Sequence, residues 1–166
     1  MHLNPMLCRD VLTGEIFPAA LAGEIFALRR DDIRFEGEFP GFKKLKARGR
    51  FFLTSHRIIF LAETEKSQAD FSSVALLFSD MRCVPDFRQP IFGANYLEIS
   101  SVDGSKCSLS FMSGGCQAFL SCFFRIFDQR PTAAIAVQVL QQRASNIAYV
   151  DPNDPSVFYV SQPRAE

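Results

Sequence analysis

The sequence lacks several features that would assign it to a familiar class. It contains no tryptophan, only two histidines, and five cysteines of which no two are spaced as C-x-x-C. An odd number of cysteines without that spacing indicates neither a disulfide framework nor a zinc site, and it favours a reducing, intracellular compartment. The chain has no run of about 18 apolar residues, as a membrane-spanning helix needs. It also has no basic region followed by an apolar run at its start. We therefore predict a soluble protein.

Neither sign of charge is in excess. The 18 lysines and arginines balance 18 aspartates and glutamates, and the isoelectric point is about 6.7. A domain whose whole surface binds nucleic acid is usually strongly basic. We therefore expect no direct nucleic-acid binding, and any anionic partner must bind to a local patch of basic residues.

Phenylalanine is abundant, with 18 in 166 residues. Large apolar rings bury much surface per residue, and a chain of this length can form one domain with a substantial core. The composition predicts one globular domain with a tail.

Seven stretches have the composition of short strands. Residues 33–39 alternate apolar and charged side chains, as a half-buried strand requires. Asp103–Gly104 predicts a hairpin turn between the last two stretches, and Pro85 limits the fifth to a strand end or an edge. The predicted strands are 33–39, 47–54, 56–63, 71–78, 80–86, 94–102 and 106–112.

A helical period follows Gly115 and predicts an amphipathic helix. Its apolar face holds Phe119, Leu120, Phe123, Phe124 and Phe127. Pro131 breaks this helix, and residues 132–145 predict a second helical stretch. The last segment holds several prolines and no clear period, so we expect it to be extended and mobile unless something docks it. The predicted organisation is an N-terminal extension (1–22), a domain (23–130), a helical extension (131–145) and a proline-containing tail (146–166).

Together these elements predict a mainly β fold with a C-terminal α-helix. A helix with one broad apolar face needs a surface to cover, and a bent sheet supplies one. We expect a seven-stranded antiparallel barrel or sandwich capped by the amphipathic helix.

Residues suited to catalysis are few. His2 lies near the start of the chain and His56 at a strand start, and neither has the spacing of metal ligands. Cys116 and Cys122 lie in the predicted helix, where a buried cysteine commonly acts as a small hydrophobe. No phosphate-binding loop, dinucleotide-binding or GxSxG pattern is present. We predict no catalytic residue, metal or cofactor; a small hydrolase or transferase is the least favoured of the alternatives.

A cluster of basic residues is the most informative charged feature. Within GFKKLKARGR it comprises Lys43, Lys44, Lys46, Arg48 and Arg50. Arg48 and Arg50 alternate with small residues, which places both guanidinium groups on one face of a strand. A local cluster of positive charge can bind phosphorylated headgroups although the net charge of the chain is zero. An ordinary solvated loop is the competing interpretation.

Two motifs resemble a known family. LTSHRIIFLAE, followed by RQPIFGANYLEI at Arg88–Ile99, is similar to the paired motifs of the GRAM-domain proteins of the WW domain-binding protein 2 family. Gly23–Phe26 resembles the usual opening of a GRAM domain, and Ser113–Gly115 with Phe119 resembles its Gly-Gly segment and helix. The resemblance covers roughly residues 20–128, and the two ends more weakly.

The resemblance implies a fold and a class of function. The fold is the pleckstrin-homology-like barrel closed by a C-terminal helix. The function is that of a non-enzymatic, protein-binding adaptor, with family members acting as transcription coactivators in nucleus and cytoplasm. Members reach WW domains through PPxY motifs, and this chain has none, which argues against a WW-domain partner. The alternative is a phosphoinositide-binding peripheral membrane module that uses the basic cluster.

Overall fold

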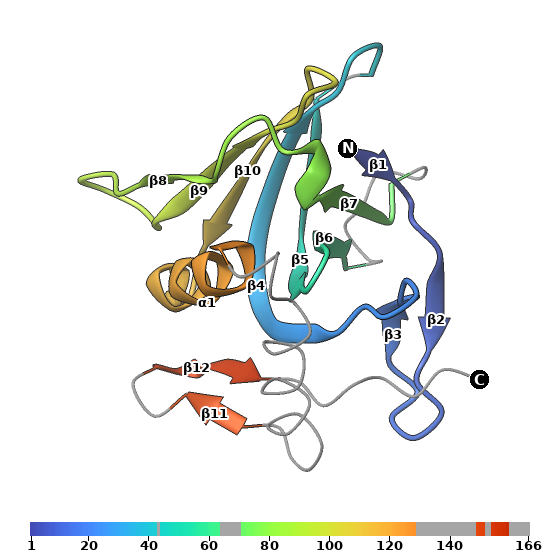
Figure 1. The fold of residues 1–166 in the computed structure, drawn as a ribbon. Coiled ribbons are helices and arrows are strands. Elements are labelled where there is room, and N and C mark those ends of the chain that lie inside the picture. Colours follow the sequence, from blue (N-terminus) through green and yellow to red (C-terminus); the bar gives the residue numbers. More distant parts are fainter. Residues whose placement is uncertain (43, 64–70, 129–148, 152–153, 160–166) are drawn as a thin grey trace.

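The computed structural model describes residues 1–42, 44–63, 71–128, 149–151 and 154–159, which form mainly antiparallel β-structure with an α-helix packed against it (Figure 1). A 3-10 turn, Phe78–Asp80, follows β7, and helix α1 spans Cys116–Asp128. The strands are β1 (His2–Leu3), β2 (Leu7–Arg9), β3 (Ile16–Pro18), β4 (Phe26–Glu38), β5 (Leu45–Thr54), β6 (Arg57–Ala62), β7 (Ser73–Leu77), β8 (Asp86–Arg88), β9 (Tyr96–Ser100), β10 (Lys106–Phe111), β11 (Tyr149–Asp151) and β12 (Asp154–Tyr159).

Strand β4 is the longest and occupies the middle of the sheet. It pairs with β5 on one side and with β10 on the other. Its register with β5 shifts between Arg30 and Ile33. Asp32, within this stretch, has a φ of 57°, which lies in the left-handed region. An extra residue of this kind forms a bulge, which bends a strand. β4 therefore curves, as Figure 1 shows, and connects the strands on the β5 side of the sheet with those on the β10 side.

The sheet remains open. Its strands run in the order β1-β7-β6-β5-β4-β10-β9-β8, and the outermost two, β1 and β8, do not pair with each other in the described part of the chain. The expectation of an antiparallel sheet with one packed helix is confirmed, whereas a closed barrel is wrong. β1 occupies the free edge of β7, with His2 opposite Ala75, and β8 is only 3 residues long.

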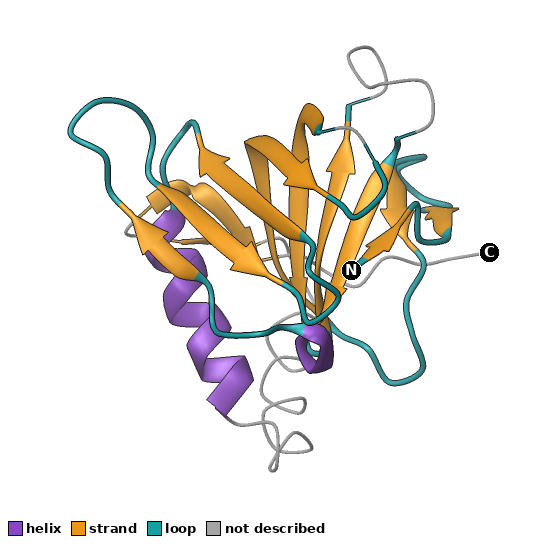
Figure 2. Cartoon of the chain, turned by 90° about the horizontal axis from the view of Figure 1, so that it is seen from above, coloured by secondary structure: helices purple, strands orange, loops and turns teal. Residues whose placement is uncertain are grey.

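The main core lies between the sheet and α1. Phe119 is fully buried, with its ring centroid 4.9 Å from that of Phe51 and 5.9 Å from that of Phe111. Phe123 packs edge-on against Phe78 at 5.6 Å. Figure 2 shows the helix along one end of the sheet. The predicted apolar face of the helix is correct for these positions, but Phe124 is 38% exposed and Ile126 is buried instead.

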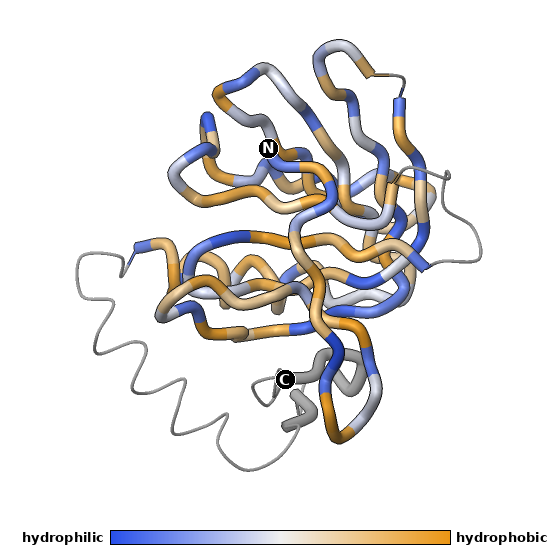
Figure 3. Tube along the Cα trace, turned by 90° about the vertical axis from the view of Figure 1, so that its right-hand side faces the viewer, coloured by the Kyte–Doolittle hydropathy of each residue, from blue (hydrophilic) through white to orange (hydrophobic). Residues whose placement is uncertain are grey.

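A second, smaller core lies under the hairpin β2–β3. Phe17 of β3 packs against Phe26 and Phe52, with ring centroids 6.5 and 5.4 Å apart. Ile59, Leu61 and Ala75 complete this cluster. β5 and β6 are therefore covered on both faces along part of their length. Figure 3 shows that hydrophobic and hydrophilic residues alternate along much of the chain.

Some predicted elements differ from the structure. The strand expected at 80–86 lies later, at Asp86–Arg88, because residues 78–80 form the 3-10 turn and Pro85 cannot donate a ladder bond. Residues 1–22, expected to be an extension, supply β1, β2 and β3. Part of the tail forms β11 and β12, and β12 pairs with β4. The predicted helix at 132–145 lies outside the described residues. Within the described part of the chain, no helix has the length and apolar character to cross a membrane.

Candidate functional site

The predicted basic cluster forms a row along β5. Lys44 precedes the strand, and Lys46, Arg48 and Arg50 alternate with buried residues within it, so their side chains share the outer face. Lys43 lies outside the described residues. Most of the cluster therefore stands on a strand rather than in a loop.

The two lysines of the row already have carboxylate partners. Glu36 of β4 lies 3.4 Å from the Nζ of Lys44 and 3.3 Å from the Nζ of Lys46, and Glu38 lies 3.3 Å from Lys44. Partial burial tends to raise the pKa of Glu36, but hydrogen bonds from Lys46 and Lys44 outweigh it and lower that pKa. A phosphate that binds here must compete with ionised carboxylates.

The two arginines are paired as well. Arg48 donates from Nε to Oδ1 of Asp32 at 2.8 Å, and hydrogen bonds from Ser113 and Arg48 lower the pKa of Asp32. Arg50 lies 3.4 Å from Oε1 of Glu15 and donates to the Ile16 carbonyl at 3.0 Å. Arg50 thus ties β5 to the β2–β3 hairpin.

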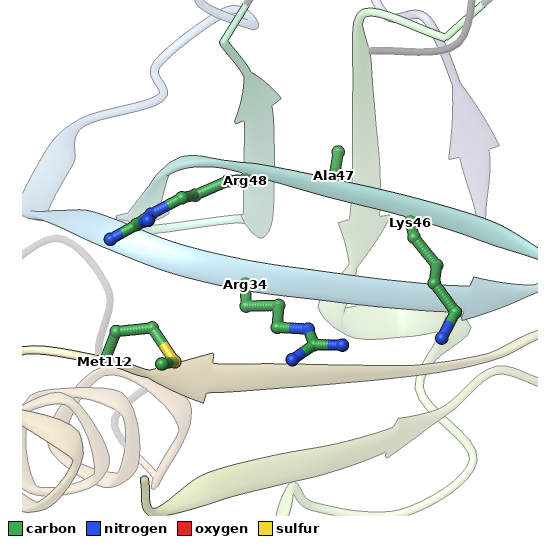
Figure 4. A pocket seen from close by; sticks show the side chains of 5 residues that line it. All are labelled: Arg34, Lys46, Ala47, Arg48 and Met112. Atoms are coloured by element: carbon green, nitrogen blue, oxygen red, sulfur yellow. The ribbon is translucent and has the colours of Figure 1, made fainter. Parts of the chain in front are cut away.

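An open hollow of about 330 Å³ lies over this face (Figure 4). Arg34 of β4 stands directly opposite Arg48 and was not among the predicted site residues. The sequence does contain a signal for Arg34, because this residue lies in the alternating stretch 33–39 on the same face as Glu36. The hollow is lined by Arg34, Lys46, Ala47, Arg48 and Met112.

The RQPIFGANYLEI motif forms the β8–β9 hairpin, which projects at the left of Figure 1. Its tip exposes two large apolar side chains, Ile91 at 93% and Phe92 at 91%. Pro90 precedes them and Gly93 follows with a φ of 106°, a value that L side chains rarely adopt. The predicted strands 80–86 and 94–102 leave this stretch as a connection, and the exposure of its apolar centre was not predicted.

The strands that carry this tip are charged. Arg88 contacts Asp86 at 2.7 Å and Glu98 at 3.3 Å. The base of the hairpin thus holds two carboxylates and one guanidinium, all about half exposed. The tip itself, residues 89–94, carries no charge.

A buried ion pair joins the LTSHRIIFLAE motif to the N-terminal part of the domain. Arg57 donates to Glu24 at 2.7 and 2.8 Å, and Thr54 donates to the same carboxylate at 2.7 Å. Arg57 also donates to the Ala19 carbonyl at 2.6 Å, and the Leu21 amide donates to Glu24 at 2.7 Å. The side chain of Glu24 has no exposed surface. Thr54 and Arg57 of LTSHR and Glu24 of GEIF are therefore one structural unit.

The Ser113–Gly115 segment has a structural role too. Arg30 donates to the Gly114 carbonyl at 2.9 Å and to the Ser113 carbonyl at 2.6 Å. Gly114 and Gly115 both have positive φ, at 82° and 83°. This turn leads from β10 into α1 and fixes the start of the helix on β4.

The histidines and cysteines do not form a cluster. His2 contacts Asp80 at 3.2 Å, and His56 contacts Ser55 at 2.7 Å. Burial raises the pKa of the Cys107 and Cys116 thiols to about 12, so both are protonated at neutral pH. In the described residues no three His, Cys, Asp or Glu side chains are grouped so as to hold a metal ion.

A comparison with solved structures finds a weak likeness. No protein-family model matches the chain, and no curated protein matches it. A crystal structure of the C-terminal domain of an unknown protein from Leishmania infantum is similar at a TM-score of 0.42 and 11% sequence identity. The match covers 64% of this chain and 86% of that domain. A likeness at this level supports no conclusion about function.

Proposed function

We propose that this chain is a non-enzymatic adaptor with a pleckstrin-homology-like, GRAM-type fold that binds a protein partner. The strand order supports the fold: the long bent strand β4 pairs with β5 on one side and with β10 on the other, and helix α1 follows β10. The resemblance of the two motifs supports the class, and with it a role in transcription or signalling in cytoplasm and nucleus.

The exposed tip of the β8–β9 hairpin carries the proposal. Burying an exposed Phe or Ile side chain contributes roughly 1.5–3 kcal/mol, and aromatic anchors dominate protein interfaces. Pro90 has a fixed φ, which reduces the conformational freedom that this part of the turn loses on binding. Because Asp86 and Glu98 outnumber Arg88 at its base, the tip suits an apolar pocket with a basic rim.

The test compares two exposed apolar positions on neighbouring turns. The full chain with Phe92→Ser is used to isolate binding proteins from cells of its source, beside the natural chain and a Val102→Ser control, whose side chain is 67% exposed. We expect the control to retain the partners and Phe92→Ser to lose them, with circular dichroism showing that all three chains fold. Equal sets of partners from all three chains would argue against the tip.

A phosphoinositide-binding module is the second candidate, favoured by the hollow between Arg34, Lys46 and Arg48. Its test is sedimentation with phosphatidylcholine vesicles, with and without phosphoinositide. One variant neutralises Lys43, Lys44, Lys46, Arg48 and Arg50, and an Arg88→Gln chain serves as control. Lipid recognition requires that phosphoinositide increase binding and that only the five-residue variant lose it. Binding that survives the neutralisation, or that never occurs, eliminates this candidate.

A further inference from the structure

β4 has an edge that β10 does not cover. β10 pairs with β4 from Ile33 to Glu38, whereas β5 pairs with it from Phe26 onward. The chain leaves β10 where the Met112 amide donates to the Asp32 carbonyl at 3.2 Å. Residues 26–31 of β4 therefore have a second edge facing away from β5. Backbone groups along an edge of this kind can pair with another strand.

The tail supplies that strand. β12 pairs antiparallel with β4, with Phe158 opposite Arg29, and β11 pairs with the other side of β12. Figure 1 shows β12 beside the bent part of β4. Strand addition gains affinity from backbone hydrogen bonds, which any extended segment can supply.

The side chains of this stretch hold β4 in place. Arg29 donates to Asp31 at 2.8 Å and to Glu15 at 3.0 Å, on the side of the β2–β3 hairpin. Arg30 reaches the turn before α1, as described above. Because the side chains of Arg29 and Arg30 are both held by hydrogen bonds, the edge is preorganised for an added strand.

We propose that the 26–31 edge of β4 is a docking site for an extended peptide, and that β12 is the occupant from the same chain, which a partner's segment displaces. The matching ligand is an uncharged, β-prone run such as Ser156–Tyr159. A tethered occupant acts at an effective concentration of roughly millimolar, so it keeps the site filled until a stronger segment replaces it. This edge is separate from the β8–β9 tip, so either proposal can fail without the other.

The test uses a fluorescein-labelled peptide, YVDPNDPSVFY, which copies residues 149–159. Its binding to the full chain is followed by fluorescence anisotropy. A locked chain carries Arg29→Cys and Phe158→Cys in a Cys83→Ser background, so that oxidation ties β12 to β4. A released chain carries Phe158→Pro and Tyr159→Pro, which remove amide donors from β12.

We expect the released chain to bind the peptide at least about tenfold more tightly than the oxidised locked chain. Reduction of the disulfide in the locked chain should restore binding. If the released chain does not fold, the comparison between the oxidised and reduced forms of the locked chain still tests the proposal. A peptide with proline in place of the phenylalanine should not bind. The proposal is overturned if oxidation does not join positions 29 and 158, if the oxidised and reduced forms bind equally, or if no form binds the peptide.

Discussion

The burial of Glu24 depends on its hydrogen-bond partners. An ionised carboxylate without exposed surface is stable only if hydrogen bonds and an opposite charge replace its hydration. Arg57, Thr54 and the Leu21 amide all donate to it. Removing one partner of such a pair leaves a buried charge uncompensated.

Replacing Arg57 should therefore destabilise the fold strongly. We expect Arg57→Met to lower the free energy of unfolding by about 3–5 kcal/mol. Arg88→Met removes an arginine that is 52% exposed, and it should cost about 1 kcal/mol or less. Urea denaturation of both chains measures the difference. Similar midpoints would mean that the Glu24–Arg57 pair does not hold the domain together.

Glu24 also predicts how stability depends on pH. Burial raises its pKa, but hydrogen bonds from Arg57, Leu21 and Thr54 outweigh burial, so the pKa in the folded state is below the ordinary value. Between the lowered pKa of the folded state and the ordinary value of ~4.3, the unfolded chain therefore binds more protons than the folded chain. Stability should be fully present above that pH and fall as acid protonates the folded carboxylate. Unfolding measured from neutral pH into acid should show a shallower decline for Glu24→Gln than for the natural chain.

The ion pairs of Glu36 with Lys44 and Lys46 could have been predicted from the sequence. Glu36 lies in the stretch 33–39, whose charged side chains alternate with apolar ones, and Lys44 and Lys46 belong to the predicted phosphate site. Pro40 and Gly41 are typical turn residues, and pairing the stretches on either side of them puts Glu36 opposite Lys46. In contrast, nothing local links Glu24 to Arg57, because the chain between them first forms β4 and β5.

At the level of elements, alternation predicted strands well where they are regular. β9, β10 and the turn at Asp103–Gly104 lie where the pattern placed them, and Gly104 has a φ of 86°. The first half of β4 was missed because the bulge at Asp32 shifts which face each side chain occupies. β1 was missed because a strand of 2 residues has no period to detect.

Helix α1 offers a matched pair of phenylalanines. Phe119 is fully buried between Phe51 and Phe111, whereas Phe124 is 38% exposed. We expect Phe119→Ala to reduce stability by roughly 3–5 kcal/mol through lost burial and an unfilled cavity. Phe124→Ala should cost about 1 kcal/mol or less. Thermal unfolding followed by circular dichroism distinguishes them, and equal losses would contradict the observed orientation of the helix.

On the scale of the whole molecule, the domain has two cores on opposite faces of one sheet. The predicted domain began at residue 23, yet Phe17 covers Phe26 and Phe52 from the segment before it. Composition showed that the chain could bury many rings. It did not show that the first 22 residues help to bury them, because β2 and β3 are only 3 residues each.

A chain that starts at residue 23 should therefore expose the second core. We expect it to bind the dye ANS and to scatter light at concentrations where the full chain does not, because Phe26, Phe52 and Ile59 lose their cover. The point variant Phe17→Ser should show the same defect more mildly. Leu12→Ser, at a side chain that is 71% exposed in the same segment, should behave like the natural chain. Normal behaviour of the shortened chain would show that the hairpin is dispensable.

The exposed hairpin tip has a spectroscopic consequence. Because the chain contains no tryptophan, a Phe92→Trp substitution creates a single indole whose emission reports one location. At 91% exposure that indole should emit like a free indole in water and be quenched freely by iodide. Any shift of its emission to shorter wavelength then identifies, in a single cuvette, the moment at which the tip enters an apolar environment.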